Sequence, residues 1–188
     1  MKAAKHLAHL AVIVLIVAGA SSLASAQLNS SAQPIALNAT LAESLTLGLS
    51  ANTVNFTLTA GSATNAGSTN VTATTSWVLK PTRTAVKVYA YFASSAAALT
   101  DGGAPANNIP SASFFISDNG GASTAVTQSA AFGGANAGLQ LANVAITGAN
   151  RNSNHADVMA FNIDLSSVPQ LPANTYTGTL NIQAQATP

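Results

Sequence analysis

The stretch Tyr176-Thr177-Gly178-Thr179-Leu180-Asn181-Ile182-Gln183-Ala184-Gln185-Ala186 alternates strictly between two kinds of residue. Its even positions are apolar or glycine, and its odd positions are polar and uncharged. Because successive side chains of a β-strand point to opposite faces, this alternation predicts a strand buried on one face only. Pro172 predicts a corner before it, since proline lacks the N–H that a central strand needs. Such a strand requires a neighbouring sheet and a second layer over its apolar face.

The same period of two recurs along the chain. Expected strands cover residues 35–41, 44–49, 54–60, 71–80, 86–92, 113–117, 122–128, 139–147 and 156–165. Glu43 breaks the first long run, and because a carboxylate is costly to bury it predicts a bend, a bulge or a sheet edge. No stretch after residue 26 has a helical period, so about nine or ten short strands predict an antiparallel β-sandwich, with a closed barrel as the weaker alternative. The residues expected inside are Phe56, Trp77, Val88, Phe161, Leu180 and Ile182.

The first 26 residues have the three parts of a secretory signal peptide. Lys2 and Lys5 precede an apolar run over residues 10–18, and Ala24-Ser25-Ala26 supplies a cleavage site before Gln27. The run is short for a membrane span and no basic stop-transfer sequence follows it, so we expect cleavage and no transmembrane segment in the mature chain. The mature chain, residues 27–188, is expected to form a single domain with a mobile tail over residues 27–34. The expected location is extracellular, at the cell surface or periplasmic.

Composition excludes several classes of function. The signal peptide holds two of the six Lys and Arg and none of the five Asp and Glu, so the mature chain has four basic against five acidic residues and a net charge of −1. A nucleic-acid partner is not expected, because it requires a broad basic face. The chain has no cysteine, which excludes a disulfide, a thiolate nucleophile and a thiolate metal site. Scarce charge weakens repulsion between copies, which suits a polymer or a surface layer.

The two ends of the mature chain resemble secreted bacterial immunoglobulin-like surface proteins, namely spore coat protein U with related pilins and, more distantly, WxL wall-binding domains. The residues that carry this resemblance are Leu171, Pro172, Tyr176, Thr177, Gly178, Thr179 and Leu180, with Leu45, Thr46, Leu47 and Leu49 near the start. The resemblance implies an immunoglobulin-like sandwich with a non-catalytic role in fibres or bound to wall polymer. Two features differ: the disulfide usual in the pilin-like members is absent, and Trp77-Val78-Leu79 has no second Trp-x-Leu near the C-terminus.

The candidates for catalysis and metal binding are few. His155 is the one histidine of the mature chain, and Asp157 shares its face if this stretch is a strand, yet no Gly-x-Ser-x-Gly elbow presents a nucleophile. The simpler interpretation is a solvated histidine at a loop end. Asp101-Gly102-Gly103 and Asp118-Asn119-Gly120 offer oxygen ligands for calcium, but turns use the same residues for backbone reasons. We therefore expect no enzyme activity, no cofactor and no metal.

Two stretches are candidate interaction sites. Lys80, Arg83, Lys87, Tyr89 and Tyr91 are a candidate glycan-binding or interface face, against the alternative that they are ordinary cross-strand pairs. Ile35, Leu37, Ala39 and Leu41 are a candidate donated strand for a second copy, against the alternative of a first strand folded onto its own sheet. The sequence thus predicts an exported structural protein, a pilin-like or coat subunit that associates with itself or with other surface subunits. The alternative is a module that binds glycans or cell-wall polysaccharide.

Overall fold

The computed structural model describes residues 28–132 and 138–188, so the expected signal peptide and part of the loop before residue 139 lie outside the description. The chain divides into two units, residues 1–40 and residues 41–188. Residues 28–43 have no secondary structure, and β1 begins at Ser44, directly after Glu43. The break expected at Glu43 is confirmed, but the interpretation of residues 35–41 as an ordinary first strand of the domain's own sheet is wrong.

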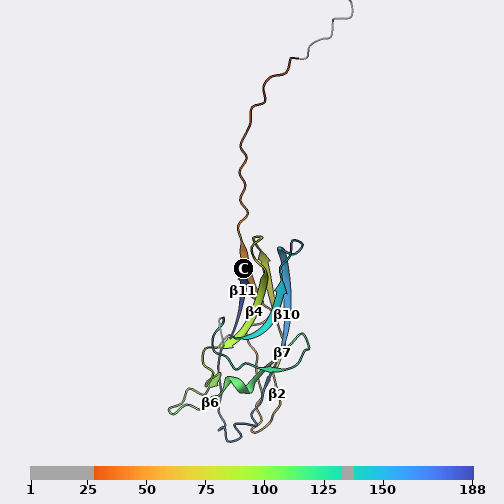
Figure 1. Ribbon diagram of the computed structural model, residues 1–188. Helices are drawn as coiled ribbons and strands as arrows, with labels where there is room; N and C mark the ends of the chain where they lie inside the picture. Colours follow the sequence, from red (N-terminus) through yellow and green to blue (C-terminus); the bar gives the residue numbers. More distant parts are fainter. Residues whose placement is uncertain (1–27, 133–137) are drawn as a thin grey trace, which may run out of the picture. The chain divides into compact units, whose positions relative to one another are not determined.

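Residues 41–188 form an antiparallel β-sandwich, as the period of two predicts (Figure 1). One sheet has the order β1-β3-β10-β7-β8, with β2 paired to β10, and the other has the order β11-β4-β9. The first sheet comprises β1 (Ser44–Leu49), β2 (Asn65–Ala66), β3 (Val71–Val78), β7 (Phe114–Asp118), β8 (Thr124–Ala125) and β10 (Asn152–Ile163). The second comprises β4 (Ala85–Phe92), β9 (Leu139–Ala145) and β11 (Leu180–Thr187). The short strands β5 (Leu99–Thr100) and β6 (Asn108–Ile109) pair with each other, and a 3-10 turn covers Ser111–Ser113.

The core lies between the two sheets. Its larger cluster joins β3, β4, β7 and β10 through buried residues that include Ala73, Phe92, Phe114 and Phe161. The rings of Phe92 and Phe114, from different sheets, meet edge to face with their centroids 5.1 Å apart. A smaller cluster forms around Trp77, Leu79 and Val86. Of the residues expected inside, Trp77, Val88 and Phe161 are buried, and Phe56, Leu180 and Ile182 pack half-buried against the larger cluster.

Several expected strand boundaries are wrong, and the strand expected at residues 122–128 is reduced to β8, Thr124–Ala125. Residues 54–60 do not form a strand and make only the isolated bridge between Phe56 and Gly67. The last strand begins at Leu180 rather than Tyr176, while β10 begins at Asn152 because its polar first residues pair with β3. The hairpin of β7 and β8 is confirmed, and Asn119 and Gly120 in its turn both have positive φ.

In the described residues, no helix combines the length and apolar character that a membrane crossing requires.

Candidate functional site

An apolar groove of about 850 Å³ opens at one edge of the sandwich. Residues 49–60, which follow β1, form one wall, and residues 171–182, which lead into β11, form the other. The core residues Phe92, Phe114 and Met159 lie at its floor. The groove therefore lies where the outermost strands of the two sheets, β1 and β11, give way to irregular chain.

The first wall is held from the side of residues 65–68. Asn55 N–H donates to Oγ of Ser68 at 3.1 Å, and Ser68 N–H donates to the carbonyl of Asn55 at 2.8 Å. The buried Asn65 accepts a bond from Thr59 N–H at 2.7 Å and donates to the carbonyl of Ile163 at 2.8 Å. These bonds to β10 and its neighbours fix the wall without making it a strand.

The second wall is held by residues 98–101. Thr177 and Thr100 exchange two backbone hydrogen bonds of 2.9 Å, and Asn174 donates its amide to Asp101 at 3.3 Å. The amide of Asn107 and the N–H of Gly103 also donate to Asp101 and lower its pKa to about 2. In the described part of the chain, no backbone hydrogen bond joins the two walls to each other. The two walls are therefore separate segments rather than paired strands.

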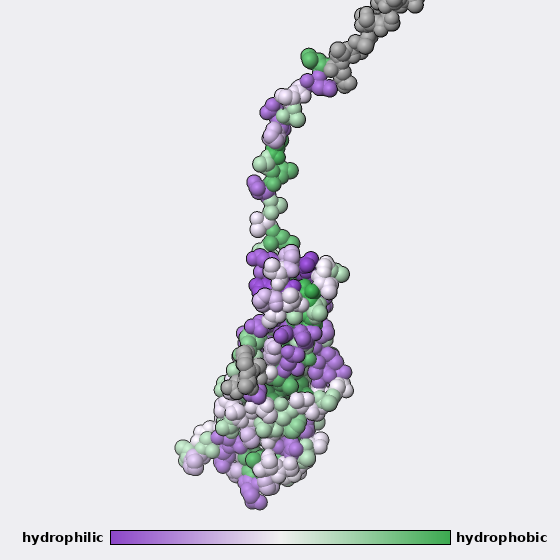
Figure 2. Space-filling view, in the orientation of Figure 1, coloured by the Kyte–Doolittle hydropathy of each residue, from purple (hydrophilic) through white to green (hydrophobic). Residues whose placement is uncertain are grey.

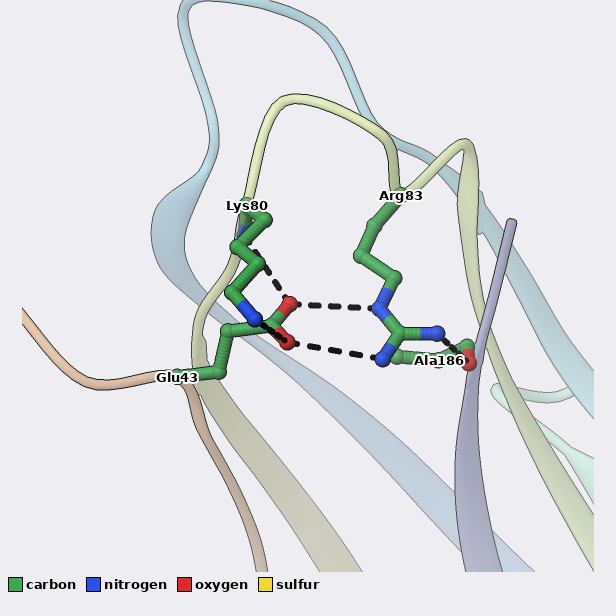
Figure 3. Close-up of polar contacts among 4 residues, drawn as sticks. All are labelled: Glu43, Lys80, Arg83 and Ala186. Carbon is green, nitrogen blue, oxygen red and sulfur yellow. Dashed lines mark hydrogen bonds and ion pairs between the residues drawn. The ribbon is translucent and has the colours of Figure 1, made fainter.

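At the start of β1, Glu43 holds a cluster of polar contacts (Figure 3). Its carboxylate accepts from Lys80 N–H at 3.0 Å and from Arg83 Nε at 3.1 Å, and Lys80 Nζ lies 3.5 Å from it. Arg83 also donates to the carbonyl of Ala186 in β11 at 3.4 Å. The side-chain bond from Arg83 is the main reason that the pKa of Glu43 falls to about 2. We call these residues the Glu43 clamp.

The candidate donated strand precedes the clamp. Ile35, Leu37 and Leu41 are 83%, 89% and 82% exposed, and Ala39 is exposed as well. Figure 2 shows apolar and polar residues alternating along this part of the chain. Large apolar side chains are seldom this exposed in a row. The apolar side of this segment is therefore left in contact with solvent.

The structure divides the candidate glycan-binding or interface face in two. Lys80 and Arg83 belong to the Glu43 clamp and lie in the turn between β3 and β4. Lys87, Tyr89 and Tyr91 lie on β4, where they alternate with the buried residues Val86, Val88, Ala90 and Phe92. The prediction that the tyrosines face away from the aliphatic side is confirmed, but the grouping of all three cations beside them is wrong, because Glu43 recruits two of them.

His155 and Asp157 share a face of β10, as the sequence predicts for a strand, and belong to a polar cluster whose burial the sequence did not indicate. Asp157 is 1% exposed, its carboxylate oxygens have no hydrogen-bond partner, and Nε2 of the half-buried His155 lies 3.0 Å from its Oδ1. The buried hydroxyl of Thr75 and one oxygen of Asp118 also lack a partner. Burial raises the pKa of Asp157 and of Asp118, and the charge of Asp157 raises the pKa of Asp118 further. The interpretation of His155 as a loop-end histidine is therefore wrong, since it lies within β10.

The candidate calcium turns take other roles. Asp101 accepts hydrogen bonds at both carboxylate oxygens from Gly103, Asn107 and Asn174. Among the residues that the structure describes, no group of three His, Asp or Glu side chains is placed to hold a metal ion. Asp101 thus acts as an internal brace of the groove wall.

Comparison with known proteins identifies no relative. No family model, no curated protein and no solved structure matches this chain.

Proposed function

We propose that this protein is an exported, non-catalytic structural subunit of the cell surface that polymerises by strand insertion. In this proposal residues 35–41 of one copy occupy the groove of the next. One observation carries it: the chain combines an exposed segment that is apolar on alternate positions with an open groove whose floor is the hydrophobic core.

The chemistry of the two parts is complementary. An extended strand places Ile35, Leu37, Ala39 and Leu41 on one side, which the apolar floor of the groove accommodates. Its backbone would lie between two walls that, in the described part of the chain, make no backbone hydrogen bonds to each other. Burying each large side chain contributes about 1.5–3 kcal/mol relative to leaving it in water.

The direction of the chain favours a second copy over self-insertion. The Glu43 clamp fixes the start of β1, whereas the groove begins near Leu49, at the other end of that strand. Six residues of strand separate these two points by about 17 Å. To enter its own groove the segment would have to reverse within the residues just before Glu43. A neighbouring copy imposes no such reversal.

Export and polymer formation also agree with composition. Residues 1–26 have the pattern of a cleaved signal peptide, and a mature net charge of −1 opposes close packing of copies only weakly. The proposed location is therefore outside the cytoplasm.

Deletion of residues 27–41 tests the proposal. The truncated protein should fold, because Glu43 and β1 remain, but should not form fibres visible by electron microscopy. A synthetic peptide of residues 27–41 should bind it and raise its melting temperature. The matched control is the same peptide with serine at positions 35, 37 and 41, which should not bind. Fibres from the truncated protein would refute strand insertion by this segment.

A further inference from the structure

The outer face of the three-stranded sheet has its own composition. The backbone register places Tyr89 of β4 between Gln183 of β11 and Gln140 of β9, and it places Tyr91 beside Asn181. Gln185 follows on β11. The inner sides of the same strands fill the core, so these amides and phenols point outward. We call this surface the tyrosine–amide face.

Both rings are held before any ligand arrives. Tyr89 Oη lies 3.3 Å from Oε1 of Gln140, and Tyr91 Oη lies 3.5 Å from Oε1 of Gln183, each phenol donating to the amide oxygen. The ring of Phe132 packs edge to face on Tyr89 with centroids 5.4 Å apart. Because the two residues are two positions apart on one strand, their Cα atoms are about 6.6 Å apart. Fixed rings lose little conformational entropy when they bind a partner.

From this chemistry we infer that the tyrosine–amide face binds a neutral polysaccharide. Sugar rings have apolar faces, which pack on aromatic rings, and hydroxyl groups, which both donate and accept hydrogen bonds. Amide side chains match them, because each has two donors and an acceptor. The face offers both kinds of contact side by side, and its use does not depend on fibre formation.

Charge selects a neutral polymer over an anionic one. Lys87 is the one ionisable side chain other than tyrosine that the described residues of β4, β9 and β11 place on this face. Lys80 and Arg83, the two cations that precede Lys87 in the sequence, pair with Glu43 instead of adding positive charge to this face. An anionic wall polymer or a nucleic acid would require several cations here.

Affinity electrophoresis of the full secreted protein tests the inference. Native gels would contain one of three neutral polymers, namely hydroxyethylcellulose, mannan or glycol chitin, and carboxymethylcellulose would serve as the anionic counterpart of the first. We expect at least one neutral polymer to retard the protein. The double variant Tyr89→Ala with Tyr91→Ala should bind that polymer at least tenfold more weakly, with a nearly unchanged melting temperature.

Two further variants separate the causes of any loss. Tyr89→Phe with Tyr91→Phe keeps both rings and should retain affinity within about threefold. If the alanine pair fails to fold, the single variants Tyr89→Ala and Tyr91→Ala take its place, and each should bind more weakly. Lys87→Gln should leave retardation by the neutral polymer unchanged. Absence of retardation by all three neutral polymers, equal retardation of the folded alanine pair, or loss of binding in Lys87→Gln would each overturn the inference. The inference would also be overturned if the tyrosine substitutions abolished only the lateral pairing of fibres and left polymer binding unchanged.

Discussion

Arg83 Nε lies 3.1 Å from Oε1 of Glu43, and this contact joins the start of β1 to the turn between β3 and β4. Through its second bond, to the carbonyl of Ala186, Arg83 links the same point to β11. One ion pair thus ties together the outermost strands of both sheets, at the position where residues 28–42 leave the domain. The clamp holds the sandwich together at the end opposite the groove.

The Glu43 clamp should make the stability of the fold depend on pH in the acidic range. Hydrogen bonds from Arg83 and Lys80 lower the pKa of Glu43 from 4.5 to about 2 in the folded protein. Its stabilising contribution is therefore complete above pH 4.5 and is lost as the pH falls toward 2. We expect Glu43→Gln to lower the melting temperature at pH 6 and to have almost no effect at pH 2. If Glu43→Gln lowered the melting temperature by the same amount at pH 6 and at pH 2, this account would be contradicted.

The buried Asp157 should have the opposite effect. Burial raises its pKa in the folded protein, so the folded state holds a proton that the unfolded state releases, and stability falls as the pH rises through this range. Asp157→Asn should flatten the fall in melting temperature that begins above about pH 4, the ordinary pKa of an aspartate. An unchanged slope would show that Asp157 does not titrate there.

Asp164 supplies the matched control for that experiment. It lies just after β10, and bonds from Ser166 lower its pKa rather than raising it. Asp164→Asn should therefore leave the slope above about pH 4 as it is, and any change should appear below pH 4. Circular dichroism at fixed ionic strength follows both variants.

The second groove wall depends on a glycine. A Cβ at position 178 would collide with the carbonyl oxygen of Ala98, so Gly178→Ala must displace the backbone at residue 178 or at Ala98. We expect it to destabilise the fold by about 1–3 kcal/mol in urea unfolding. Gly48→Ala, in β1, is the control, because its Cβ would meet no atom within 4 Å. Equal unfolding midpoints for the two variants would contradict this account of the wall.

Alternation predicted which side chains face the core better than it predicted which segments are strands. Val54, Phe56 and Leu58 do point inward and line the groove, as their spacing indicates. This segment nevertheless forms no strand: the N–H groups of Asn55 and Thr59 donate to the side chains of Ser68 and Asn65. Periodicity reports only the side on which a residue lies, whereas a strand also requires a hydrogen-bonding neighbour, and this information is not local.

The candidate site residues show the same limit of prediction from local sequence. Lys80, Arg83 and Lys87 are close in sequence, and nothing local indicates that Glu43, some forty residues earlier, binds the first two. The position of Asp157 beside His155 followed from strand geometry, but its burial did not, because a carboxylate normally indicates an exposed face. Long-range partners decided both cases.

Polymerisation should depend on one side of the candidate donated strand. Leu37→Asp places a charge on the apolar side and should abolish fibres, since a carboxylate is costly to bury in the groove. Asn38→Asp carries the same charge on the opposite side and should leave them intact. Electron microscopy and sedimentation of the two purified variants give the comparison. Equal fibre yields would show that the alternation of this segment has no role in assembly.

The most direct test of strand insertion uses the absence of cysteine from the chain, which makes introduced thiols unambiguous. Leu37→Cys protein would be mixed under mild oxidation with protein carrying Val54→Cys, Leu58→Cys or Leu171→Cys, three positions that line the groove. We predict a disulfide-linked dimer between Leu37→Cys and at least one of these variants, and a much lower yield when Asn38→Cys replaces Leu37→Cys. Fibres that assemble without a cross-link to any of the three groove positions would contradict the account.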